Sequence, residues 1–458
     1  MGENHGAQTR LMRSLSLWSV AFLAASWMSP AAGVFIIAPE ILQGVGTGTL
    51  LAFVFGTIFT AFVVALDLEA LSIWPSCGGM YVFIAKSLNQ RIGLAYLFYY
   101  VILSLFVVSV LASGIGPYLR PFLPNMSDTM IAQLTIALAF GFSLLNLRIN
   151  EWATSSFLLL ELLLLLLLFA VGAAHFEPSH APRLLHSYIP SANGWQIASW
   201  AAFLYIALGP VGWITSGTQT AATVFSEEMK NPRHFVRAAF ISMLIIVLVQ
   251  LLPILAVLMS DYDVTALLKS KAPFTDFMIH YMDPRWALVI DAGVALATFN
   301  AMIVSFLFAM RVIFSTARNG VWPEKLSQFL SQRSQRTDCL WGAAVVVFLC
   351  CFCLNFLPTS SLMLIISAFM ATLTVAIPIG CWQARRNGHR GMFRVPFFPI
   401  FVVIFYIWNA TLLWSIWNNP HGGPLLFLLP VGLFIFSQLY HHLYLRHRPQ
   451  FHIEGAPD

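Results

Sequence analysis

Charged residues are scarce in this chain. Asp, Glu, Lys and Arg together make up 9% of its 458 residues, whereas apolar residues make up 59%. Soluble domains carry roughly 25% charged residues, so water cannot be the solvent for most of this protein's surface. The composition excludes an ordinary soluble domain and predicts a protein embedded in a membrane.

Cysteine is scarce too, and no cysteine spacing indicates a disulfide framework. Cys350, Cys351 and Cys353 share one apolar stretch, where they are either small packing residues or a metal cluster. The formal charge of +5 comes from Lys and Arg in short gaps between apolar runs. They form no continuous basic face, so nucleic acid is not an expected partner.

Catalytic motifs are also absent. The chain has no HExxH, no Walker A segment and no paired acid and histidine motif. A polytopic membrane enzyme is therefore the remote alternative. No cofactor and no metal site are expected.

Long apolar runs, in contrast, recur along the whole chain, and a helix of about 20 apolar residues spans a bilayer while satisfying its own backbone. We expect an all-α polytopic membrane protein with twelve transmembrane helices. These are predicted at 15–42, 49–72, 91–113, 129–147, 152–173, 196–225, 236–259, 286–316, 339–357, 361–383, 396–418 and 424–445. The first run resembles a signal peptide, but it continues to Ile41 and is expected to be a retained helix.

The distribution of Lys and Arg predicts the orientation. Nineteen of the 24 fall in the loops on the side of the amino terminus. The other five are Arg120, Arg183, Lys269, Lys271 and Arg285. The positive-inside rule therefore predicts cytosolic tails at 1–14 and 446–458, in a plasma or inner membrane.

The first and sixth predicted helices are each interrupted near the middle by helix-breaking residues. The first interruption is Ser29 to Gly33, and the second runs from Gly209 through Gly217. A single kink is usually structural, but matched breaks five helices apart indicate an inverted-repeat transporter with its site at the midplane. They fit alternating access better than the fixed pore of a channel.

Four stretches in predicted cytosolic loops resemble the amino acid–polyamine–organocation (APC) permeases. They are Glu69 with PSCGGMY (75–81), LNLRIN (145–150), SEEMKNPRHFVRAA (226–239) and RVIFSTARNGVWPEKLS (311–327). After about residue 340 the likeness is one of hydropathy and of the FRVPFFP run (393–399).

The resemblance implies a LeuT-like fold. Two inverted five-helix repeats, at about 15–173 and 196–383, would form a core over 15–383, with two further helices in 396–445. It also implies secondary active transport of an amino acid or related amine. A polyamine or cationic amine permease and an amino acid exchanger remain alternatives, H⁺ and Na⁺ are the candidate coupling ions, and lipid is the other partner.

The same resemblance places substrate at the two breaks. Its carboxylate would meet N–H groups near Ala31, Ala32 and Gly33, favoured by the half-helix dipole. Its ammonium would meet backbone carbonyls near Trp27 to Ser29 and near Ala207 to Gly209. In the sixth helix, Trp213 with Gly217 resembles the arrangement in which an aromatic ring covers the substrate; the alternative for Trp213 is a packing role.

Acids within the spans are costly and are functional candidates. Glu161 lies mid-helix in a run of leucines. It is a neutral hydrogen-bonded acid, a proton-coupling group, or the counter-charge for a cation. Asp67, Glu69 and Asp291 lie near helix ends, where each is either a solvated residue or a gating group; Glu69 and Asp291 are the leading gating candidates.

Two further groups keep two interpretations each. The histidines of the carboxyl-terminal segment, His441, His442, His447 and His452, form a metal site or a juxtamembrane segment that faces anionic lipid. Tyr99 and Tyr100 line the pocket or anchor their helix at the interface.

Overall fold

A computed structural model describes residues 13–145, 147–191, 194–270, 272–334, 336–337, 339–418, 426–448 and 451. Most of the predicted tails 1–14 and 446–458 lies outside these residues. The first half contains α2 (Leu17–Met28), α3 (Pro30–Ala32), η1 (Gly33–Ile37), α4 (Ala38–Val45), η2 (Gly46–Gly48), α5 (Thr49–Ile73), α6 (Met80–Ser87), α7 (Gln90–Gly114), α8 (Gly116–Leu119), α9 (Asp128–Ser143), α10 (Leu147–Ala174), η3 (Pro178–Leu185), β1 (Tyr188–Ser191) and β2 (Gly194–Ile197).

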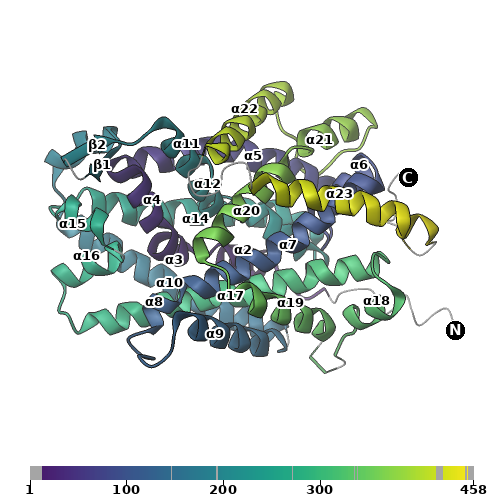
Figure 1. Ribbon diagram of the computed structural model, residues 1–458, viewed down its shortest axis with the longest axis horizontal. Coiled ribbons are helices and arrows are strands. Elements are labelled where there is room, and N and C mark those ends of the chain that lie inside the picture. The colour runs from purple at the N-terminus through teal and green to yellow at the C-terminus, as the bar shows by residue number, and fades with distance from the viewer. Residues whose placement is uncertain are drawn as a thin grey trace.

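The second half contains α11 (Trp200–Leu208), α12 (Pro210–Thr215), α13 (Thr218–Val224), η4 (Ser226–Glu228), η5 (Pro232–His234), α14 (Phe235–Leu258), α15 (Val264–Lys269), α16 (Pro273–Tyr281), α17 (Trp286–Arg318), α18 (Glu324–Leu330), α19 (Trp341–Leu354), α20 (Thr359–Thr374), α21 (Ile377–Arg386), α22 (Phe398–Trp417), α23 (Leu428–Leu443) and η7 (Leu445–His447). Figure 1 shows these helices packed side by side in one bundle.

Within the described residues, nine helical stretches are long and apolar enough to cross a membrane. The longest, Leu17–Ile73, contains the first and second predicted helices. Two predicted spans correspond to shorter apolar helices, Asp128–Ser143 and Trp341–Leu354. The polytopic helical class is therefore confirmed, while the count of twelve spans stays a prediction.

One loop between the predicted helices contains a small sheet that the sequence did not predict. Between α10 and α11 the chain forms a two-stranded antiparallel sheet, in which Tyr188 pairs with Ile197 and Ser191 with Gly194. The Tyr188 N–H donates to the Thr47 hydroxyl, 3.0 Å away, so the hairpin packs on the turn between α4 and α5. Sequence periodicity cannot detect strands of four residues.

The span predicted at 361–383 is also interrupted. A turn at Val375 and Ala376 separates α20 from α21, and Pro378 stands in the first turn of α21. Proline fits the first turn of a helix because its missing N–H needs no partner there. The Ala376 N–H instead donates to the Tyr96 hydroxyl of α7, at 2.9 Å.

Helix α2 lies in the centre of the bundle, in contact with α10, α13, α14 and α17. Around it, α7 packs against α17 and α20. The outward side of α10 exposes Leu159, Leu163 and Leu166, whereas Glu161 is 1% exposed. Exposed leucines beside a buried carboxyl are typical of a helix that faces lipid on one side and protein on the other.

Close backbone packing joins α5 to the interrupted sixth segment. A Cβ at Gly56 would lie 2.1 Å from the Ala207 carbonyl oxygen and 2.8 Å from Val211. Small residues at such positions let helices approach closely, which is the main source of helix association in lipid.

We predict that Gly56→Ala destabilises the protein by about 1–3 kcal/mol, because the backbone of α11 cannot yield to the new methyl group. Gly141→Ala is the matched control, since nothing lies within 4 Å of a Cβ there. This control should be neutral or stabilising by about 0.5–1 kcal/mol. Thermal unfolding in detergent measures both; equal melting temperatures for the two variants would contradict the close approach.

Candidate functional site

The first helix breaks at Ser29. Helix α2 ends at Met28, and Ser29 adopts a left-handed conformation with φ 40° before α3 begins at Pro30. The Ser29 hydroxyl accepts a hydrogen bond from the Ala32 N–H at 3.2 Å, and the Ser29 carbonyl accepts one from Gly33 at 2.9 Å. The backbone groups freed by the break therefore have partners inside the break itself.

The Glu161 carboxyl of α10 lies against this break. The Ser29 hydroxyl donates to Glu161 Oε2 at 3.1 Å, and Asn300 Nδ2 of α17 donates to Oε1 at 2.8 Å. The backbone of Ala31 also hydrogen-bonds the carboxyl. No ion pair to Glu161 occurs among the described residues. Glu161 is thus held by neutral donors from two helices and the break.

The sixth segment breaks twice. Gly209 (φ −89°, ψ −93°) separates α11 from α12, and Ser216 and Gly217 separate α12 from α13. Gly217 has φ 111°, which favours glycine, and a Cβ there would lie 2.7 Å from the Trp27 ring. The Gly217 N–H donates to Gln219 Oε1 at 3.0 Å, so a side chain again satisfies the open backbone.

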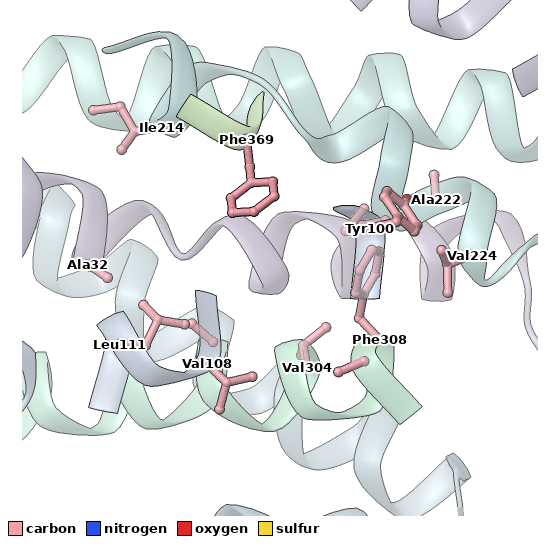
Figure 2. Packing of buried hydrophobic residues seen from close by; sticks show 14 of the residues in the cluster. Ala32, Tyr100, Val108, Leu111, Ile214, Ala222, Val224, Val304, Phe308 and Phe369 are labelled. Atoms are coloured by element: carbon pink, nitrogen blue, oxygen red, sulfur yellow. The ribbon is translucent and has the colours of Figure 1, made fainter. Parts of the chain in front are cut away.

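A cavity lies between the two broken segments and α5, α7, α20 and α22. The ends of the breaks contribute Trp27, Met28, Gly209, Trp213 and Gly217. Valine, leucine and isoleucine form the largest group among the remaining lining residues, including Val63, Val107, Val110, Leu111, Leu208 and Ile366. Figure 2 shows Val108 and Leu111 of α7 and Ile214 of α12 in this region of the core.

The predicted substrate residues divide between cavity and core. Gly209, Trp213 and Gly217 line the cavity. The other five, Ser29, Ala31, Ala32, Gly33 and Ala207, are buried and outside its lining. Gly33 packs on α14, where a Cβ would come within 2.4 Å of the Gln250 amide. The predicted binding roles stay predictions.

Three of the family-like loops meet at one end of the bundle. Arg311 binds Glu228 with two hydrogen bonds of 2.7 and 2.9 Å, and Arg318 binds Glu227 at 2.9 and 3.0 Å. The Cys77 N–H donates to Glu227 at 2.8 Å. The segments 75–81, 226–239 and 311–327 thus form one ion-pair cluster.

Electrostatics explain the protonation states in this cluster. Burial favours the neutral form of Glu227, but the hydrogen bond and charge of Arg318 and the N–H of Cys77 together lower its pKa. Ionised Glu227 therefore stabilises the fold at neutral pH. This stabilisation is lost when the pH falls below the usual pKa range of a glutamate and the carboxyl takes up a proton. Burial raises the pKa of Cys77 to about 12, so it is an unreactive thiol.

Comparison with known proteins decides the family. A sequence profile described as "Amino acid permease" matches residues 15–436. The chain belongs to the amino acid permease family. It is similar to the Escherichia coli K12 "Inner membrane transport protein YbaT", with 21% identity over 418 residues, 89% of this chain and 91% of that protein. The Bacillus subtilis 168 "Branched-chain amino acid permease BcaP" is 22% identical over 327 residues, 65% of each chain.

The predicted resemblance to the APC superfamily is thereby confirmed. The permease is an integral membrane protein and a transporter of amino acids, not an enzyme.

The two gating candidates of the permease differ in their surroundings. Glu69 of α5 is 2% exposed and binds Arg385 of α21 at 2.5 and 2.6 Å, and it also accepts the Val395 N–H at 2.8 Å. Glu69 therefore ties α5 to α21. Asp291 is partly buried near the start of α17, within electrostatic range of Asp276. Gating by either residue stays a prediction.

Sequence reasoning undervalued several polar residues of the permease. Asp67, Thr60, Tyr100 and Gln219 line the cavity, and Asn300 holds Glu161. The available signal was a polar side chain within an apolar run, which in a membrane helix usually faces the protein interior. That signal does not say which neighbouring helix the side chain meets.

We predict that replacing one partner of the buried Arg311–Glu228 pair destabilises the permease more than replacing both. Both side chains are 6% exposed, so Arg311→Met or Glu228→Met leaves an unpaired buried charge and should cost about 3–5 kcal/mol. The double variant should recover part of this loss. Thermal unfolding of the four proteins forms the cycle, and additive losses would contradict a direct pair.

Proposed function

We propose that the permease is a secondary active transporter that works by alternating access. The proposed architecture has twelve spans, with two inverted five-helix repeats and two further helices, in the inner membrane with both termini cytosolic. The observation that carries the proposal is the cavity between two segments that are interrupted at Ser29 and at Gly209 and Gly217. Interrupted backbone at membrane depth is tolerated where it lines a cavity.

The lining of the cavity supports a small apolar amino acid as substrate. Valine, leucine and isoleucine are the largest group of side chains in it, and no Lys, Arg or His is among the described lining residues. The similarity to a protein named a branched-chain amino acid permease points the same way. The alternatives are a cationic amine or polyamine, and exchange rather than net uptake.

Glu161 and the first break supply the proposed coupling device. The carboxyl bridges Ser29 of the break, Ala31 of α3 and Asn300 of α17, so a change in its charge alters the contacts of all three. Ser29, Ala31, Ala32 and Gly33 are proposed to act as the hinge that Glu161 holds. The proposed coupling ion is H⁺, because the carboxyl itself can carry it.

The transport function predicts saturable uptake of a labelled apolar amino acid into proteoliposomes, measured across a panel that includes polyamines. Trp213 lines the cavity, so Trp213→Leu should weaken substrate binding several-fold with a smaller effect on the melting temperature.

Trp200→Leu is the control, since the same substitution falls on a side chain that is 76% exposed outside the cavity. It should leave uptake unchanged. Equal uptake by the two tryptophan variants would remove Trp213 from the substrate site, and absence of saturable uptake for every compound would contradict the transport proposal itself.

If Glu161 couples transport to protons, its substitution should affect gradient-driven uptake and substrate exchange differently. Glu161→Gln keeps the shape of the side chain but removes its titration, so uptake driven by an inward proton gradient should fall at least tenfold while exchange of labelled for unlabelled substrate continues. Glu324→Gln, an exposed site in α18, is the control. Gradient-driven uptake at the wild-type rate in Glu161→Gln would contradict proton coupling at this site.

A further inference from the structure

The cavity contains a single carboxyl among its described lining residues, that of Asp67 on α5. Asp67 is 7% exposed, and among the described residues it has no Lys, Arg or His partner. Thr60, Val63 and Asp67 follow one another at spacings of three and four residues, so one face of α5 carries all three into the cavity. A buried acid in a membrane protein requires a partner that stabilises it.

One oxygen of Asp67 has such a partner and the other does not. Gln219 Nε2 donates to Oδ2 at 3.0 Å. The Gln219 orientation is set independently, because its Oε1 accepts the Gly217 N–H at 3.0 Å and its amide nitrogen must then face Asp67. Within the described part of the chain, Oδ1 is a buried acceptor with no hydrogen-bond partner.

Aromatic side chains lie at the same end of the cavity. The Trp27 and Phe308 rings are stacked with centroids 5.0 Å apart, and Tyr100 lies 5.6 Å from Phe308. Figure 2 shows the Tyr100 and Phe308 rings next to each other between their helices, and their planes are tilted by 59°. All three residues line the cavity with Asp67. Aromatic faces attract ammonium groups, most strongly in sites without water.

We propose that Asp67 and the rings of Trp27, Tyr100 and Phe308 form a subsite for the ammonium group of the substrate. The proposal rests on the transport function proposed above and deepens it by orienting the substrate: its charged nitrogen meets Asp67, and its apolar part lies along Val107, Val110 and Leu111. An ammonium donor fits the open Oδ1 acceptor.

The subsite also connects substrate to the backbone of the sixth segment. Asp67, Gln219 and Gly217 form a continuous hydrogen-bonded chain from α5 to the break between α12 and α13. An ammonium that binds Oδ1 therefore contacts the same carboxyl that orders the break. At the first break, the Ala32 and Gly33 N–H groups have Ser29 as their partner, and the backbone of Ala31 bonds Glu161.

The experiment compares three probes that share one apolar side chain: leucine, 3-methylbutylamine, which lacks the carboxylate, and 4-methylpentanoate, which lacks the amine. Affinities come from thermal stabilisation of the purified full-length protein. If another amino acid binds best in the uptake panel, its decarboxylated and deaminated forms replace these probes. We expect wild type to bind the amino acid and the amine and to bind the acid at least tenfold more weakly.

Asp67→Asn keeps an acceptor for Gln219 and removes the charge. This variant should lose at least tenfold in affinity for both the amino acid and the amine, with little change in the affinity for the acid. Asp283→Asn, an exposed position outside the cavity, is the matched control and should bind as wild type does.

Tighter binding of the acid than of the amine by wild type would overturn the subsite, and this arm does not depend on the variant folding. If Asp67→Asn binds both nitrogen-containing probes with wild-type affinity, the subsite is also overturned. This holds even if the variant has lost proton-driven uptake. Failure of the transport proposal would give a different result from failure of the subsite, because the wild-type protein would then take up no amino acid.

Discussion

Every backbone N–H and C=O that leaves a helix inside a membrane needs a protein partner, and the permease meets this requirement at two interruptions by different means. At the first break, the Ser29 hydroxyl and carbonyl accept the N–H groups of Ala32 and Gly33. At the second, the amide of Gln219 accepts the N–H of Gly217. Because each unsatisfied group in hydrocarbon costs several kcal/mol, these contacts allow the breaks to exist.

Both breaks are tied to neighbouring helices through an acid. Glu161 joins the first break to α10 and, through Asn300, to α17, while Asp67 joins the second break to α5. The two carboxyls are held by neutral donors rather than by Lys or Arg among the described residues. A neutral donor set binds a carboxyl less firmly than an ion pair does, so ligands or protons that arrive at either acid compete with weak rather than strong contacts.

Three charged pairs with little solvent exposure lie elsewhere, at the end of the bundle where the family-like loops meet. Arg311 with Glu228, Arg318 with Glu227 and Arg385 with Glu69 each join segments far apart in the sequence. The Glu228 carbonyl also accepts the N–H groups of Ser14 and Leu15, so the segment before α2 belongs to the same assembly. Ion pairs between side chains stabilise this end of the permease, whereas the cavity is lined mostly by apolar side chains.

The sequence by itself determined the membrane class, the family and the places where the first and sixth helices break, because apolar length, helix-breaking residues and contiguous motifs are local properties. It also singled out Glu161, since an acid within a run of leucines is anomalous wherever the helix packs. The tertiary structure alone decided the partners. The sequence could not show that Glu161 meets the first break, that Asp67 rather than Ala31 to Gly33 faces the cavity, or that Gln219 connects Asp67 to Gly217, because each contact depends on how helices distant in the chain are rotated and packed against one another.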